Sequence, residues 1–191
     1  MRGWQLTKKG KLLVIAGPSG VGKGTLVKFI INNFDDFHLS VSATTRDPRP
    51  GEVNGSSYIF ISDSEFSELV NSGMMLEWAT VHGKHRYGTP RAPVLEALHN
   101  GLNVILEIDV QGALQVKQSY PDALLLFVKP PSFDELKRRL SERGTESALE
   151  QEVRLETARI ELDQAKSFDF TVINDEVERC AREVVDLVQS T

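Results

Sequence analysis

Continuous apolar runs alternate along the chain with segments whose apolar residues recur at helical spacing. The runs cover residues 11–16, 102–108, 123–128 and 170–174. A short apolar run without polar alternation is typical of a strand that is buried on both faces of a sheet. We therefore predict four buried strands.

Segments with helical periodicity fill the intervals between these runs. After the first run, apolar side chains such as Leu26 and Val27 fall on one helical face. Gly101 is a typical helix terminator, and Ser132 and Glu135 have the spacing of a capping box. Helices are predicted over residues 24–34, 90–100, 132–143, 147–167 and 175–189.

Strands that alternate with helices indicate βαβ crossovers, and hence an α/β fold with a parallel sheet flanked by helices. Residues 39–87 break this rhythm. They are rich in Ser, Thr, Pro and Gly, with short β-like pieces and one small helix, "DSEFSELVNSG". We interpret this segment as an inserted mixed β/α subdomain.

Composition narrows the functional classes. The 191 residues suit one domain with small insertions, and the formal net charge of −5 gives no general affinity for nucleic acid or anionic membranes. The single cysteine, Cys180, excludes an intrachain disulfide and fits a reducing compartment. Since no apolar run approaches the roughly 18 residues that span a bilayer, we expect a cytoplasmic protein.

The segment "GPSGVGKGT" between the first predicted strand and helix has the Walker A pattern of a phosphate-binding loop. Glycines let backbone N–H groups approach an anion, and the helix N-terminus adds positive potential. The pattern usually has Ser or Thr after the lysine, to reach Mg²⁺, but Gly24 stands there, which makes Thr25 the candidate. The residues predicted to bind a nucleoside triphosphate are Gly17, Pro18, Ser19, Gly20, Val21, Gly22, Lys23, Gly24 and Thr25.

Further segments are more specific than this loop. They include "TTRDPRPGEVNGSSY", "EWATVHGKHRYGT", "EIDVQG", "RRLSERGTE" and "VIND". Together they cover nearly the whole chain and resemble the guanylate kinases, a family of nucleoside monophosphate kinases. The resemblance implies Mg²⁺-dependent phosphoryl transfer from ATP to GMP, and also to dGMP. It also implies a nucleotide-binding core (residues 1–38, 88–131 and 155–191), a GMP-binding subdomain (39–87) and a lid (132–154).

The resemblance places the phosphate of GMP against the inserted subdomain. Arg46 and Arg49 carry guanidinium groups that suit bidentate contact with a monophosphate. Tyr58 and Tyr87 each offer a hydroxyl group to the same phosphate. The segment before Tyr87, "GKHRYG", is one residue longer than is usual in the family.

The guanine base is expected to meet an acceptor. The Glu77 carboxylate only accepts hydrogen bonds, which suits the donors at guanine N1 and N2 that adenine lacks. Ser42 and Thr89 would complete the base contacts. These assignments come from the resemblance, and a solvated surface position is the alternative for each residue.

Two acids lie at the end of the second predicted strand. Glu107 and Asp109 are two residues apart, which places them on one face of a strand. By resemblance, Asp109 lies near the metal and GMP. The alternative is a pair of acids that cap the next loop.

The predicted lid supplies further cations. By resemblance, Arg139, Arg143 and Arg154 close onto the phosphates, although charged runs are usually solvated helix faces. Arg139 and Arg143 are four residues apart and share one side of a helix. Asn174 and Asp175 are implied to lie near adenine. The predicted catalytic residues are thus Lys23, Arg46, Arg139, Arg143 and Arg154.

Other functions stay open at this point. "DVQG" matches the D-x-x-G pattern of regulatory GTPases, but the chain has no N-K-x-D motif. A kinase for another small phosphorylated substrate and a catalytically weak protein-binding module are the remaining alternatives. The expected partners are ATP and GMP or dGMP, without nucleic acid or membrane, in a monomer or a homodimer.

Overall fold

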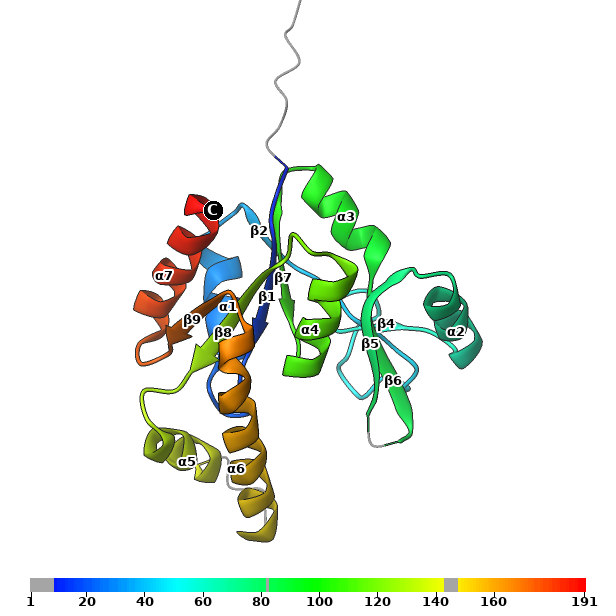
Figure 1. Ribbon diagram of the computed structural model, residues 1–191. Coiled ribbons are helices and arrows are strands. Elements are labelled where there is room, and N and C mark those ends of the chain that lie inside the picture. The colour runs from blue at the N-terminus through cyan, green and yellow to red at the C-terminus, as the bar shows by residue number, and fades with distance from the viewer. Residues whose placement is uncertain (1–8, 82, 143–147) are drawn as a thin grey trace, which may run out of the picture.

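The computed structural model describes residues 9–81, 83–142 and 148–191, with the backbone alone for 148–150. Within these residues the chain forms a five-stranded and a four-stranded sheet (Figure 1). The strands are β1 (Leu12–Ala16), β2 (Phe37–Leu39), β3 (Ala43–Thr44), β4 (Ile59–Phe60), β5 (Met75–Val81), β6 (His85–Pro90), β7 (Asn103–Glu107), β8 (Leu124–Lys129) and β9 (Phe170–Ile173). The helices are α1 (Lys23–Asn33), α2 (Asp63–Asn71), α3 (Arg91–His99), α4 (Val110–Ser119), α5 (Phe133–Ser141), α6 (Ala148–Asp163) and α7 (Val177–Ser190), with a 3₁₀ turn, η1 (Gln164–Ser167).

The five-stranded sheet has the order β2-β7-β1-β8-β9, and all its strand pairs are parallel. The four predicted strands are β1, β7, β8 and β9, each within one residue of its expected bounds. The α/β fold class with a parallel sheet is therefore confirmed. The parallel arrangement brings the carboxyl ends of β1, β7 and β8 to one edge.

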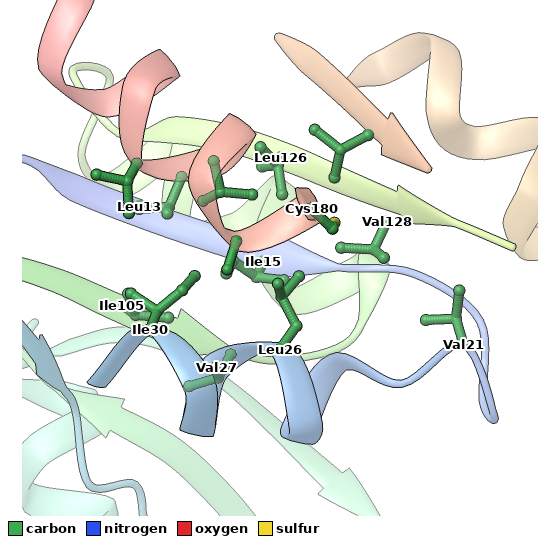
Figure 2. Close-up of a cluster of buried hydrophobic side chains, with 14 of the residues drawn as sticks. Leu13, Ile15, Val21, Leu26, Val27, Ile30, Ile105, Leu126, Val128 and Cys180 are labelled. Atoms are coloured by element: carbon green, nitrogen blue, oxygen red, sulfur yellow. The ribbon is translucent and has the colours of Figure 1, made fainter. Parts of the chain in front are cut away.

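The central strand β1 is buried on both faces because its side chains alternate between two cores. Leu13 and Ile15 pack with α1 and α7 in the cluster that Figure 2 shows. Leu12 and Val14 point to the opposite face and pack with α3 and α4. Each fully buried aliphatic side chain contributes about 1.5–3 kcal/mol, so the end of β1 is a firmly held starting point for the loop that follows.

The start of α5 corrects one expectation. Oγ of Ser132 accepts the N–H of Glu135 at 3.1 Å, as a cap should. The reciprocal bond of a capping box is absent, because the Glu135 carboxylate instead accepts hydrogen bonds from Arg138 and Arg139. The complete capping box lies at Ser62, which precedes α2.

Two elements of the core were not predicted. Strand β2 has only three residues and lies at the sheet edge, too short for a clear hydrophobic pattern. Helix α4 carries Gly112 in its first turn, and glycine lowers helix propensity by about 1 kcal/mol. The packing of α4 against the sheet outweighs this cost.

The insertion forms the second sheet, ordered β4-β3-β6-β5, whose longest pair is the antiparallel β5–β6 hairpin. Strand β5 contacts the core through α4, where the Trp78 N–H donates to Oε1 of Gln115 at 3.2 Å. In Figure 1 this hairpin and the α5–α6 pair extend past the same edge of the parallel sheet. Ligands of α/β sheets bind at this carboxyl edge.

None of the helices in the described part of the chain combines the length and the apolar character that crossing a bilayer requires.

Candidate active site

Residues 17–22 form the loop between β1 and α1. Gly20 and Gly22 have φ values of 83° and 94°, which L side chains rarely adopt. A Cβ at Gly22 would lie 2.6 Å from Nδ2 of Asn174, so the loop also lacks room for a side chain there. The backbone N–H groups and the N-terminus of α1 thus face a surface free of side chains, which suits a phosphate.

Lys23 bends back over this loop. Its Nζ donates to the carbonyl oxygens of Gly17 at 2.5 Å and Pro18 at 3.2 Å. The ammonium group is therefore at the loop, where a phosphate on the N–H groups would meet it.

A carboxylate that was not predicted also reaches the loop. Glu161 of α6 is half-buried, and burial raises its pKa, while the Lys23 ammonium and a hydrogen bond from the Ser19 N–H oppose that shift. No sequence motif marks Glu161, because only the packing of α6 brings it here. Arg154 precedes it by seven residues, about two helical turns, and so shares its face of α6.

Asn174 and Arg139 both donate hydrogen bonds to the loop, at Val21. Nδ2 of Asn174 donates to the carbonyl oxygen of Val21 at 2.8 Å, and Nη1 of Arg139 donates to the same oxygen at 3.2 Å. Asn174 is buried, and its Oδ1 has no hydrogen-bond partner among the described residues. The structure thus brings Arg139, from the predicted lid, against the phosphate-binding loop.

Asp175 is engaged elsewhere. Its carboxylate accepts the Glu176 N–H at 2.7 Å and Nε of Arg179 at 2.9 Å. The Arg179 guanidinium lowers the pKa of Asp175. These contacts tie Asp175 to the start of α7, whereas its neighbour Asn174 contacts the loop.

A second basic group lies in the insertion. Nε of Arg46 donates to the Tyr87 hydroxyl at 3.1 Å, and the guanidinium carbon lies 5.4 Å from the centroid of the Tyr58 ring. Three of the four side chains predicted to bind the GMP phosphate are therefore together. The bidentate edge of Arg46, which we expected to face a phosphate, instead pairs with Glu52 at 2.9 Å for each nitrogen.

Arg49, three residues after Arg46, is exposed. A cavity of about 190 Å³ opens between the insertion and the core. Ser42, Tyr58, Thr89 and Glu107 are among its lining residues, so it joins the two parts of the candidate site. A larger hollow of about 800 Å³ lies over α2, but its charged lining residues are acidic and do not suit a phosphate.

Glu77 is a buried acid, with 7% of its surface exposed. Thr89, opposite it on β6, donates its hydroxyl to Oε1 of Glu77 at 2.7 Å. Burial raises the pKa of Glu77, and the nearby charge of Asp109 adds to this effect. Burial makes the ionised carboxylate of Glu77 unfavourable, and such a buried acceptor is expected where a carboxylate recognises hydrogen-bond donors.

Asp109 lies beyond the end of β7, so strand alternation does not set its direction. It is the N-cap of α4, and its Oδ1 accepts the Gly112 N–H at 2.7 Å. The capping alternative therefore holds for Asp109, and the D-x-x-G pattern is accounted for as a helix start. Capping leaves the other carboxylate oxygen for further contacts.

The guanylate kinase family model matches residues 9–191. The chain belongs to the guanylate kinase family. It is 54% identical over 181 residues to a guanylate kinase of Leifsonia xyli, covering 95% of this chain and 71% of that protein. For the guanylate kinase of Nocardia farcinica, identity is 50% over 186 residues, with 97% and 96% covered. A crystal structure of guanylate kinase from Anaplasma phagocytophilum superposes with a TM-score of 0.73 at 29% identity, over 97% of this chain and 88% of the other.

These relatives support the activity of a guanylate kinase, an enzyme of the nucleoside monophosphate kinase type. The family uses ATP and GMP as substrates. The regulatory GTPase, the protein-binding module and the kinase for another substrate are not favoured.

The oxygen donors near the loop suit Mg²⁺, which an ATP-using kinase family implies. An ideal Cβ at Gly24 would lie 3.6 Å and 3.7 Å from the carboxylate oxygens of Glu107, and the exposed Thr25 follows in the first turn of α1. No cluster of three acidic, His or Cys ligands occurs in the described part of the chain. The donor set therefore fits a Mg²⁺ ion that takes its remaining ligands from phosphates and water.

The two other arginines predicted in the lid are Arg154 and Arg143. Arg154 lies in α6 and is half-buried. Arg143 lies outside the described residues, so its predicted contact with the phosphates stays a prediction.

Two substitutions of Asp109 can separate its role as a helix cap from any role in the reaction. Asp109→Ala should lower the free energy of unfolding by about 1 kcal/mol, because the Gly112 N–H loses its acceptor. Asp109→Asn should preserve stability, since Asn caps as well as Asp, yet lower kcat by removing the negative charge. Chemical denaturation and steady-state kinetics of both variants check this. Full activity in Asp109→Asn would assign the residue to capping alone.

Proposed function

We propose that this chain transfers the γ-phosphoryl group of ATP to GMP, and also to dGMP, with Mg²⁺ as the cofactor. The proposal is supported by two groups of cationic and hydrogen-bond-donating residues that could each bind a phosphate. One is the loop with Lys23, and the other is the group of Arg46, Tyr58 and Tyr87. The buried Glu77 beside the second group supports guanine as the base.

The acceptor needs no general base in this proposal. The second pKa of a phosphate monoester is about 6, so the attacking oxygen of GMP is already largely anionic at neutral pH. The protein's task is to align two anions that repel each other and to neutralise charge on the transferring group. We assign that task to Lys23, Arg46, Arg139, Arg143 and Arg154.

The ATP site is proposed to comprise residues 17–25 and Asn174. Backbone N–H groups of the loop would bind the phosphates, and Asn174, which contacts the loop through the Val21 carbonyl oxygen, would lie near adenine. Thr25, Glu107 and Asp109 would hold Mg²⁺. When bound, the ion supplies positive charge to the phosphate oxygens and helps to orient them.

The GMP site is proposed to have a phosphate end and a base end. Arg49 would join Arg46 and the two tyrosines at the phosphate, since its exposed side chain lies in the same loop. At the base, Oε1 of Glu77 accepts the Thr89 hydroxyl, and the carboxylate would also accept the donors of guanine. Ser42, which lines the adjoining cavity, would complete the base contacts.

Closure is proposed to complete the site. Residues 39–87 and the lid at 132–154 would move against the core, with hinges near 38–41, 88–90 and 130–132. The separate second sheet supports such a unit. Closure would exclude water, the competing acceptor, until both nucleotides are bound. We also propose a cytoplasmic location, where both nucleotides are abundant.

A coupled assay of ADP release with ATP and GMP, dGMP, AMP, CMP or UMP tests this function. We expect kcat/KM for GMP to exceed that for AMP by at least about 10³-fold, because AMP leaves the Glu77 carboxylate without donors. Comparable rates with AMP and GMP would refute the substrate assignment. Release of ADP at equal rates without any monophosphate would indicate an ATPase instead.

A further inference from the structure

Glu52 lies in the loop that carries both phosphate-binding arginines, and the proposed function leaves it without a role. Its carboxylate accepts three hydrogen bonds: from Nη1 and Nη2 of Arg46, each at 2.9 Å, and from the Arg49 backbone N–H at 2.7 Å. The Glu52 N–H in turn donates to the Arg49 carbonyl oxygen at 3.0 Å. The carboxylate thus closes the loop from 46 to 52 upon itself.

The Arg46 side chain is nearly saturated by these contacts. Nη1 also donates to the Asp47 carbonyl oxygen at 2.7 Å, and Nε donates to the Tyr87 hydroxyl. A guanidinium group has five N–H bonds, and the described residues provide acceptors for four of them. One N–H on Nη2 is left for an incoming phosphate.

The contacts of Arg49 are of a different kind. Its backbone is held by Glu52, while its exposed guanidinium makes no hydrogen bond or ion pair with any described residue. Arg46 is thereby fixed in one orientation, and Arg49 can adjust to the phosphate. Side-chain exposures of 10% for Arg46 and 21% for Glu52 show that the fixed pair is shielded from water.

We propose that Glu52 is a positioning residue of the acceptor-phosphate site: it holds Arg46 against Tyr87 and fixes the loop from which Arg49 reaches the phosphate. This inference rests on the proposed function, because it assumes that the phosphate of GMP binds to this group. Glu52 keeps its place when the phosphate binds, since breaking its pair with Arg46 would leave a shielded carboxylate without its partner.

The positioning role and a purely electrostatic role predict opposite changes in the affinity for GMP when the Glu52 carboxylate is removed. Glu52 cancels one positive charge at the site, so a purely electrostatic view predicts tighter GMP binding when the carboxylate is removed. Positioning predicts the reverse, because a released Arg46 loses its orientation and must be ordered again by the substrate. The direction of the change in affinity therefore separates the two.

The test compares Glu52→Ala and Glu52→Gln with the unaltered chain. We expect both to raise KM for GMP and its Kd, measured calorimetrically without ATP, by roughly ten- to hundredfold. KM for ATP should change by less than about twofold, because the loop at Lys23 is built separately. Glu52→Gln preserves the side-chain size, so it remains informative if the alanine variant folds poorly. Glu68→Ala, which removes an exposed carboxylate from α2 of the same subdomain, is the control and should leave both constants unchanged.

A double-variant cycle shows whether Glu52 acts through Arg46. In an Arg46→Ala background, Glu52→Ala should raise KM for GMP by a much smaller factor than in the unaltered chain, because only its contact with the Arg49 backbone remains to be lost. A full effect in that background would overturn the proposal. So would unchanged or tighter GMP binding in Glu52→Ala, or equal losses for GMP and ATP together with a lowered melting temperature. If the unaltered chain neither binds nor phosphorylates GMP, the proposed function fails instead, which is a separate result.

Discussion

Lys23→Ala is expected to lower kcat for the transfer from ATP to GMP by roughly 10³-fold or more. The ammonium group lies over the phosphate-binding loop, within hydrogen-bond distance of the carbonyl oxygens of Gly17 and Pro18. In the transition state, charge spreads over the oxygens of the transferring phosphoryl group, and the Lys23 ammonium group would neutralise part of it. The coupled ADP-release assay at saturating ATP and GMP measures the loss.

The fold should survive this substitution. Lys23 begins α1 at the edge of the site and contributes nothing to the two apolar cores. The melting temperature should therefore stay within about 2 °C of that of the unaltered chain. Lys28→Ala removes an exposed lysine from the same helix and should leave kcat unchanged. A Lys23→Ala variant with more than a tenth of the original kcat would contradict the role given to Lys23.

Glu77→Gln is expected to lower kcat/KM for GMP by roughly 10²–10⁴-fold. A glutamine oxygen can replace only one of the two carboxylate oxygens, and its amide group would face the donors of guanine. KM for ATP should change little, because Glu77 lies on the second sheet, away from the loop. Steady-state kinetics with each nucleotide varied in turn checks the split, with Glu68→Gln as the control. Equal losses for GMP and ATP would show that Glu77 does not recognise the base.

The same substitution should stabilise the fold. Burial raises the pKa of Glu77 above the ordinary value of 4.5, so the folded protein bears the cost of a buried charge at neutral pH. Such a cost is present above the folded-state pKa and disappears as the pH falls below the unfolded-state value. Glu77→Gln should therefore raise the free energy of unfolding most at about pH 8, with a smaller gain toward about pH 5. A lower stability at every pH would show that the charge is compensated by contacts other than Thr89.

Hydrophobic patterning was sufficient for the core of the fold. Strands β1, β7 and β8 are continuous apolar runs, since a strand covered by helices on both faces needs few polar side chains. The prediction of a fully buried strand was wrong for β9, which lies at the sheet edge with Thr171 and Ile173 exposed. The exceptions follow from the same physics. Strand β2 is too short to show a pattern, and α4 is held by packing that compensates for Gly112.

The parts of the candidate site that are built from one continuous segment could be predicted from the sequence. The loop at residues 17–25 needs glycines and a lysine at fixed positions, so its pattern identifies it. Glu161 had no such signal, because only tertiary packing brings α6 against Ser19. The pairing of Arg46 with Glu52 likewise depends on loop closure over six residues. Sequence thus identifies the charged groups, whereas the structure decides which of them neutralise one another.

The two proposed anion-binding groups should act on two nucleotides across one gap. A compound with adenosine and guanosine joined by a chain of five phosphates tests it by calorimetry. We predict one molecule bound per chain, a Kd at least about 100-fold lower than that of ATP or GMP, and displacement by either nucleotide. Binding of two molecules per chain, or an affinity no better than that of ATP alone, would contradict it.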